Sequence, residues 1–106
     1  MILTTTEAIS GKKITKVYGL VRGNTIRARH VGKDIMAGFK NLVGGEIADY
    51  TKMMAESREQ AIDRMIEDAE SLGANAVVCI RFATTSMMQS AAELLVYGTA
   101  VTCEDI

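Results

Sequence analysis

Residues 50–82, YTKMMAESREQAIDRMIEDAESLGANAVVCIRF, decide the fold. Apolar or small side chains recur there at the three- and four-residue spacing of one helix face, and charged residues fill the positions between them. The apolar face consists of Met54, Ala61, Ile62, Met65, Ile66, Ala69 and Leu72. Gly73 can adopt the left-handed conformation that commonly ends a helix, and residues 76–80 have the composition of a buried strand. This stretch therefore predicts an α+β fold in which a long helix precedes a strand.

The length of the chain, 106 residues, indicates one domain over residues 1–106 with a core of its own. No stretch reaches the roughly 18 uninterrupted apolar residues of a membrane span. Residues 1–7 lack the basic and apolar regions of a signal peptide. Two distant cysteines, Cys79 and Cys103, are too few for a disulfide framework and are typical of a reducing compartment. We expect a cytoplasmic protein.

Charge is unevenly distributed along the chain. Residues 1–40 carry eight basic and two acidic residues, a net charge of +6, whereas residues 41–106 carry four basic and eleven acidic residues, a net charge of −7. A basic half can bind nucleic acid, but the five aromatic residues do not alternate with the basic ones as in a base-stacking surface. We expect instead that the basic strands meet the acidic helix, within one subunit or between identical subunits.

The remaining elements follow from shorter patterns. Residues 4–9 predict a short edge strand, and residues 14–21 and 25–31 predict either a hairpin around the turn residues 22–24 or one long strand with a bend. A short helix is expected from Lys33 to the Gly44-Gly45 break, and the long helix from between Glu46 and Tyr50, with Asp49 or Thr51 as its cap. Residues 84–90 predict a loop and residues 91–103 the last strand. The predicted fold is a small, mainly antiparallel sheet packed against one long and one short helix, in the order β-β-(β)-α-α-β-β.

The last strand predicts self-association. Its two faces, Leu95-Tyr97-Thr99-Val101 and Leu94-Val96-Gly98-Ala100, are both apolar or small. A strand with one solvated face should alternate apolar with polar residues, and the helices of one short chain can cover only one face of a small sheet. We therefore expect a second subunit to cover the other face and the sheet edges, in a homo-oligomer.

Two groups of residues before the long helix could bind ligands. His30, the only histidine, could act as an acid–base group oriented by Asp34 or as a metal ligand, although a strand-end histidine bonded to backbone or carboxylate is the commoner case. Arg27, Arg29 and Lys33 near a helix start could hold an anion. The same basic residues could instead pair with acidic residues of a neighbouring subunit.

Cysteine and methionine residues give weaker indications of metal chemistry. Neither cysteine has a cysteine or histidine within four residues, so a zinc site within one subunit is disfavoured. A site made by Cys103 residues of several subunits stays open, because thiolates bind soft metals. The pairs Met53-Met54 and Met87-Met88 lack a copper-binding pattern and are more typical of packing. No phosphate-binding loop, nucleophile elbow or catalytic set is present, so we expect a non-enzymatic protein.

Four segments together resemble the uncharacterised YbjQ-like family of small bacterial and archaeal proteins. They are RARHVGKDIMAGFKNLVGGEIADYT at 27–51, ESREQAIDRM at 56–65, LGANAVV at 72–78 and AAELLVYGTAV at 91–101. The likeness runs from about Thr4 to Val101. It implies a β-rich α+β subunit in a ring-like homopentamer and brings the family label "putative heavy-metal-binding". At the motif-matched positions, His30, Asp34 and Glu46 have suitable ligand atoms, whereas Cys103 lies beyond the last motif.

The sequence thus predicts a non-enzymatic, cytoplasmic homo-oligomer, pentameric by resemblance, whose partner is a further copy of itself rather than nucleic acid or a membrane. Three alternatives stay open. An enzyme whose site is shared between subunits is the least favoured of them, and the two others concern binding. One is metal-ion binding, divalent or soft, at subunit interfaces or the ring axis, through His30, Asp34, Glu46 or Cys103. The other is a ring that binds an anion or small molecule through Arg27, Arg29 and Lys33.

Overall fold

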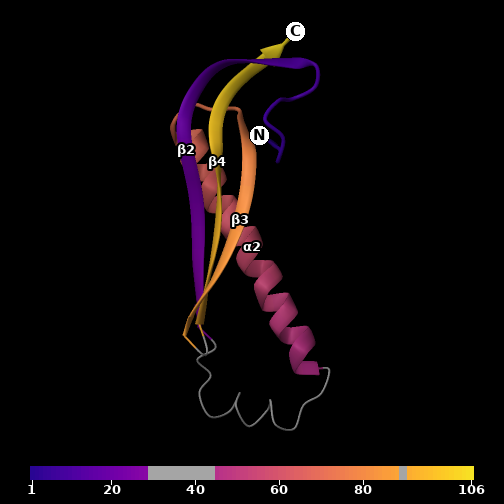
Figure 1. Ribbon diagram of the computed structural model, residues 1–106, viewed down its shortest axis with the longest axis vertical. Helices are drawn as coiled ribbons and strands as arrows, with labels where there is room; N and C mark the ends of the chain where they lie inside the picture. Colours follow the sequence, from indigo (N-terminus) through magenta and orange to yellow (C-terminus); the bar gives the residue numbers. More distant parts are fainter. Residues whose placement is uncertain (29–44, 89–90) are drawn as a thin grey trace.

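The computed structural model describes residues 1–28, 45–88 and 91–106. They form an elongated subunit of 57 × 21 × 16 Å (Figure 1). Its elements are β1 (Ile2–Leu3), β2 (Lys12–Ala28), α2 (Gly45–Ser71), β3 (Ala76–Met88) and β4 (Ala91–Asp105). Within the described ranges, no helix has the uninterrupted apolar sequence needed to cross a bilayer.

The four strands form one mixed sheet in the order β1-β3-β4-β2. β4 lies in the middle and pairs antiparallel with both long strands, β2 and β3. The short β1 pairs parallel with the start of β3, and backbone hydrogen bonds continue this edge at Thr4, whose amide donates to Val77 and whose carbonyl accepts from Ile80, both at 3.1 Å. β2 has no strand partner on its outer side among the described residues, so one long edge of the sheet is open.

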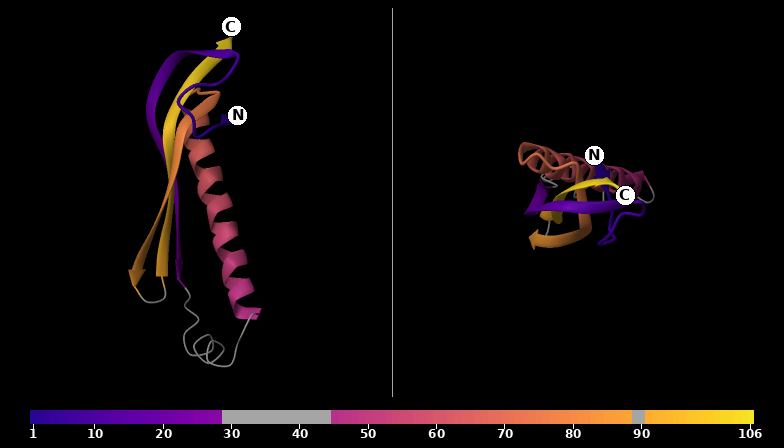
Figure 2. Two further views of the ribbon diagram at one scale, coloured as in Figure 1. Left: turned by 45° about the vertical axis from the view of Figure 1, so that its right-hand side comes forward. Right: turned by 90° about the horizontal axis from the view of Figure 1, so that it is seen from above.

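α2 covers one face of the sheet, and the main core lies between them. Ala61, Met65 and Ala69 of the helix are fully buried and pack against residues of all three long strands, among them Val21 and Val96. The helix backbone lies over β2 and β4 and farther from β3. Figure 2 shows that α2 is close to the strands near its C-terminal end and diverges from them toward its N-terminal end. The helix-side surface of β3 is therefore left partly open.

Gly23 allows the helix to approach this closely. A Cβ atom at Gly23 would collide with the backbone carbonyl oxygen of Ala61 and would lie 2.6 Å from the amide nitrogen of Met65. Two residues along the strand, the Thr25 hydroxyl donates a hydrogen bond of 3.3 Å to the carbonyl of Ser57. Thr25 and Ser57 are both buried, and buried polar groups need hydrogen-bond partners, which this bond supplies for the Thr25 hydroxyl and the Ser57 carbonyl. The backbones of β2 and α2 are thus in close contact in the middle of the core, and the Thr25 side chain adds a hydrogen bond between them.

The other face of the sheet carries a second, smaller core near the chain termini. Ala76, Val78, Val101 and Cys103 form it, and Ile2 and Ile9 of the N-terminal segment pack against them. Successive strand residues point to opposite faces, which is why these residues alternate with those under α2. Part of the face that we expected another subunit to cover is therefore covered by the chain's own residues 1–11.

A β-bulge in β3 lies between Val78 of the second core and Ile80 of the main core. Between Val78 and Arg81 the register against β4 shifts by one residue, so that Cys79 and Ile80 together lie opposite Gly98. Cys79 has a φ of 57°, a left-handed conformation that is uncommon for a residue with a Cβ. A Cβ at Gly98 would lie 2.9 Å from the Val78 carbonyl oxygen and 3.2 Å from Cγ1 of Ile80, so glycine fits there. The bulge turns Ile80 toward α2 and into the main core.

Several sequence predictions are confirmed. The long helix, the glycine at its end and the strands after it are present, and Gly73 has a φ of 91°. Of the two possibilities for the segment around residues 22–24, one long strand is correct over the described residues, with irregularities between Ile14 and Lys16 and between Val17 and Gly19. The α+β class and the predominance of antiparallel pairing also hold.

Other predictions are wrong. The N-terminal strand is Ile2–Leu3 rather than residues 4–9, because only two residues reach full pairing with β3. Residues 84–88 belong to β3 rather than to a loop, since all of them but Met87 pair with β4 despite their largely polar composition. The long helix begins at Gly45, so Asp49 and Thr51 lie inside it and do not cap it. The short helix predicted from Lys33 lies outside the described residues.

Candidate functional site

Large apolar side chains are exposed on the face of β2 and β4 that α2 does not cover. We call this surface the outer face and define it by Val17, Leu20, Ile26 and Tyr97, which are 62%, 69%, 57% and 36% exposed. They lie on strands paired in register, with Leu20 opposite Thr99 and Ile26 opposite Glu93. The outer face borders the open edge of β2. Exposed apolar side chains that gather beside an unpaired strand edge are typical of a protein–protein interface.

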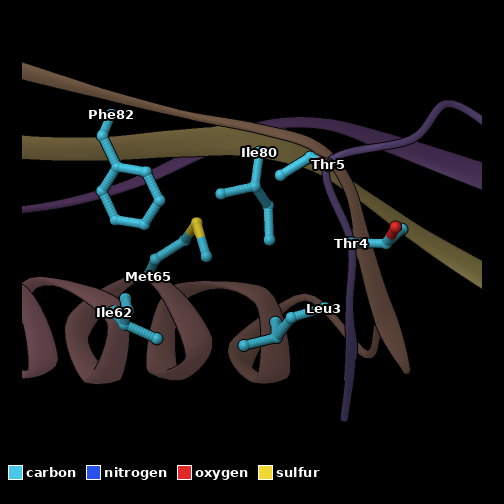
Figure 3. A pocket seen from close by; sticks show the side chains of 7 residues that line it. All are labelled: Leu3, Thr4, Thr5, Ile62, Met65, Ile80 and Phe82. Carbon is cyan, nitrogen blue, oxygen red and sulfur yellow. The ribbon is translucent and has the colours of Figure 1, made fainter.

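A second apolar surface is a cleft between α2, β3 and the N-terminal segment (Figure 3). Its volume is about 200 Å³, and its lining consists of Leu3, Thr4, Thr5, Ile62, Met65, Ile80 and Phe82. In Figure 3 the side chains of Phe82 and Ile80 project from β3 toward Met65 and Ile62 of the helix, while Leu3 closes one end. Phe82 is 49% exposed. The cleft exists because α2 lies over β2 and β4 and leaves the helix side of β3 partly uncovered at Phe82.

One ion pair joins β2 to β4 within the described ranges. At the start of β2, the Lys12 ammonium lies 2.5 Å from a carboxylate oxygen of Asp105 near the end of β4. The hydrogen bond and the opposite charge raise the pKa of Lys12 and lower that of Asp105. The Asp105 side chain is 85% exposed, so this pair is largely solvated.

Contacts between the basic strand β2 and the acidic helix α2 use backbone groups. The guanidinium of Arg64 donates to the carbonyl of Asn24 at 2.5 Å, and the amide of Arg22 donates to a carboxylate oxygen of Asp68 at 3.4 Å. Among the described residues, the ion pair that forms joins β2 to β4 rather than to α2. The expected pairing of the basic strand region with the acidic helix is therefore not made by ion pairs within the described part of the subunit.

Most residues singled out from the sequence as ligands lie outside the described ranges. Arg29, His30, Lys33 and Asp34 fall within residues 29–44, which the structure does not describe. Arg27 lies near the end of β2, and Glu46 lies in the first turn of α2. The anion site and the metal site proposed for these residues therefore stay predictions from the sequence.

Cys103 lies in β4 and is only 4% exposed. Its backbone exchanges two hydrogen bonds with the Asn75 side chain, at 2.8 and 2.9 Å, which fix the strand where the thiol enters the second core. Glu46 is far away, since the N-terminal end of α2 and the C-terminal end of β4 lie at opposite ends of the molecule (Figure 1). Within the described residues, no three metal-ligating side chains of His, Cys, Asp or Glu gather in one place.

The two cysteines are also separated from each other. Both belong to the second core, where Cys79 is half-buried. The antiparallel pairing of β3 with β4 begins at Ala76 and Val101. Cys103 lies two residues past this pair on β4, and Cys79 lies three residues from it on β3, in the opposite direction along the sheet. At about 3.3 Å per strand residue this separation is roughly 17 Å, well beyond the reach of a disulfide. One subunit does not unite its two thiols at a common site.

Comparison with known proteins decides the family. A family model described as "Putative heavy-metal-binding", YbjQ_1, matches residues 1–104. The chain belongs to the YbjQ_1 family. The resemblance inferred from the sequence motifs is thereby confirmed. Curated relatives of the chain carry the name UPF0145 protein, which states no activity.

Relatives in bacteria and archaea match nearly the whole YbjQ_1 chain. A UPF0145 protein of Clostridioides difficile is 63% identical over 105 residues, covering 99% of this chain and 94% of the relative. One of Methanosarcina acetivorans is 58% identical over 101 residues, covering 95% of each chain. A crystal structure of a DUF74-family protein of unknown function from Pediococcus pentosaceus aligns with a TM-score of 0.66 at 15% identity, covering 98% of each chain. This last likeness supports the fold alone.

The sequence predicted an uncovered apolar face on the last strand, but it did not identify the β2 residues of the outer face or the cleft. The outer face could have been found, since Leu20-Val21 and Thr25-Ile26 place apolar residues on both sides of a strand whose one side is covered by α2. The cleft could not, because strand alternation alone does not reveal the bulge at Cys79 that sets the direction of Ile80 and Phe82.

Proposed function

We propose that this YbjQ_1 protein acts as a self-assembling, non-enzymatic subunit of a cytoplasmic homo-oligomeric ring, with five subunits as the family resemblance implies. The observation that carries the proposal is the outer face. Burying Val17, Leu20, Ile26 and Tyr97 against another copy would remove this apolar surface from water, which contributes about 25 cal/mol per Å² of apolar area. The open edge of β2 offers backbone groups for the same contact.

Native mass spectrometry of untagged protein tests this proposal, with a dilution series to measure the strength of assembly. We expect one closed oligomer at micromolar concentration. Leu20→Asp should dissociate it, because a carboxylate would be buried in an apolar contact. Leu72→Asp is a matched control, since Leu72 is 45% exposed but lies at the end of α2, away from the outer face. A wild-type protein that is monomeric at tens of micromolar would refute the proposal.

Metal binding at subunit interfaces is a second candidate. The description of the YbjQ_1 family favours it. Glu46 and Cys103 lie at opposite ends of one chain and cannot share a site there, so symmetry-related copies of one residue could supply the ligands instead. Around a ring axis, copies of His30 could converge in this way, whereas the Cys103 thiol, 4% exposed in the second core, would first have to leave that core. Imidazole and thiolate ligands would suit a soft or borderline cation such as Zn²⁺ or Cu⁺.

Elemental analysis of the assembled, untagged protein tests this second candidate. A stoichiometric metal that is lost in His30→Ala or Cys103→Ser, while the oligomer keeps its mass, would support it. Cys79→Ser is the control, because Cys79 lies apart from Cys103 in the fold. Wild-type oligomer that stays metal-free after incubation with Zn²⁺ and with Cu⁺ would contradict it.

A further inference from the structure

The two apolar surfaces lie on opposite sides of the sheet. Thr25 faces α2, because its hydroxyl bonds the helix backbone at Ser57, so its neighbour Ile26 points to the other side. Phe82 faces the helix side, since it lines the cleft together with Ile62 and Met65. One subunit cannot bring its own outer face into its own cleft.

The cleft and the outer face also lie on different strands at opposite margins of the sheet. The outer face borders β2, the last strand in the order β1-β3-β4-β2. The cleft opens along β3 beyond its pairing with β1, where Phe82 is half exposed. Two different apolar surfaces at opposite margins fit a head-to-tail contact, in which each subunit uses one surface for each of two neighbours.

Charge supports the same arrangement. β2 carries five basic residues and no acidic one, a net charge of +5, whereas α2 carries eight acidic and three basic residues, a net charge of −5. Arg22 shares the sheet face of Leu20, and Glu59 and Asp63 are exposed on α2 beside Ile62, which lines the cleft. A neighbour's outer face seated against the cleft would bring these opposite charges together.

We propose that the outer face of one subunit, centred on Leu20, docks in the α2–β3 cleft of the next, centred on Phe82. This inference rests on the proposed self-assembly and specifies its contact. Because the two surfaces differ, the contact is heterologous and repeats from subunit to subunit until it closes into a ring. Leu20 or Ile26 supplies the apolar side chain, and Phe82, Ile62 and Leu3 supply the walls.

Complementary variants test the contact. Leu20→Asp spoils the outer face and leaves the cleft intact, whereas Phe82→Asp spoils the cleft and leaves the outer face intact. Each variant alone should be monomeric by native mass spectrometry. An equimolar mixture should form a 1:1 heterodimer and no larger species, because only one intact pair of surfaces is then available. The mixture is measured at the highest concentration at which each variant alone is still a monomer.

The outcomes separate this inference from the proposed function. A monomeric wild type overturns both. A wild-type oligomer with an assembled Phe82→Asp, or two monomeric variants whose mixture yields no heterodimer, overturns the head-to-tail contact and leaves self-assembly standing. Far-UV circular dichroism checks that each variant is folded. If Phe82→Asp is unfolded, Phe82→Ala replaces it, and its mixture with Leu20→Asp must give the same heterodimer.

Discussion

Single residues set how closely the helix and the sheet can pack. Gly23 is decisive, because any Cβ there meets the backbone of α2 rather than a side chain that could rotate away. Gly98 has a comparable role opposite the bulge in β3, where the Val78 carbonyl and the Ile80 side chain leave no room for a Cβ. At both positions the space between elements, rather than a turn, requires glycine.

Gly23→Ala should destabilise the protein by about 3 kcal/mol, near the upper end of the range for overpacking, because backbone atoms of Ala61 and Met65 must move. Gly11→Ala is the control. Gly11 has a φ of 78°, but a Cβ there would meet no atom within 4 Å, so its cost is conformational alone, about 1 kcal/mol. Urea unfolding at fixed protein concentration measures both. An equal loss of unfolding free energy in Gly23→Ala and Gly11→Ala would show that the close approach of α2 at Gly23 does not require glycine there.

The Lys12–Asp105 pair predicts a specific pH dependence. The folded protein holds the pKa of Asp105 below its unfolded value, so the carboxylate stabilises the fold above the usual Asp pKa of about 3.9. This contribution disappears as the pH falls through the lowered folded pKa. The raised pKa of Lys12 means that the same pair is also lost at strongly alkaline pH, as Lys12 deprotonates.

Asp105→Asn should therefore be slightly less stable than wild type at pH 7 and equal to it in strong acid. The effect is small because the pair is exposed. Urea midpoints between pH 2 and pH 8 measure the convergence, and Glu104→Gln, one position away and opposite Lys13, is the control. A difference between Asp105→Asn and wild type that stays constant down to strong acid would contradict the pairing.

At the scale of elements, α2 holds its place through small residues and one large one. Ala61 and Ala69 allow close approach, and Met65 between them is the largest fully buried side chain of the core. Tyr18 fastens the end of the helix, since its hydroxyl lies 3.3 Å from the Gly73 carbonyl and 2.9 Å from the Thr102 hydroxyl. The N-terminal half of the helix diverges from the sheet and depends less on these contacts.

Met65→Ala should cost about 3 kcal/mol, because it removes a large side chain from a closed core and leaves a cavity. Met54→Ala makes the same chemical change at a half-buried position in the diverging half of the helix, and it should cost clearly less. Thermal and urea unfolding compare the two variants. Similar losses would mean that α2 packs evenly along its length.

The elements that could be predicted from sequence are those whose pattern is local. The spacing of Ala61, Met65 and Ala69 repeats over several turns, and Gly73 marks the end of the helix, so α2 was recognisable. The far half of β3 was not, because Thr84, Thr85 and Ser86 are exposed and carry no apolar alternation. Their strand conformation is imposed by pairing with β4, a partner that local sequence does not reveal.

The two candidate surfaces also differ in how far local sequence patterns predict them. Apolar residues on both faces of β4 predicted an interface, and the structure places Tyr97 on the outer face. The sequence did not indicate that residues 1–11 cover part of that face, because Ile2 and Ile9 reach it only through the parallel pairing of β1 with β3. The cleft at Phe82 depends on a bulge and on the lateral position of α2, which are properties of the assembled fold.

At the scale of the whole molecule, opposite charges on β2 and α2 predict that assembly weakens with salt. Surface charges separated by more than about 8 Å are screened at physiological ionic strength, whereas apolar burial is not weakened by simple salts. The dissociation constant of the oligomer should rise between 50 mM and 500 mM NaCl. Sedimentation equilibrium measures it, and Arg22→Gln should reduce the salt dependence. A dissociation constant independent of salt would contradict charge complementarity between subunits.

The strand order also governs the sequence of events during synthesis. β2 emerges from the ribosome early, yet its partner β4 consists of residues 91–105, and β1 must wait for β3 at residue 76. Until then, α2 is the described element that can form without a distant partner. β2, with 17 residues, therefore spends most of translation unpaired. Its five positive charges and absence of acidic residues would keep nascent chains apart during that interval, so the composition that we propose attracts a neighbour's helix after folding would also protect the strand from misassembly before it.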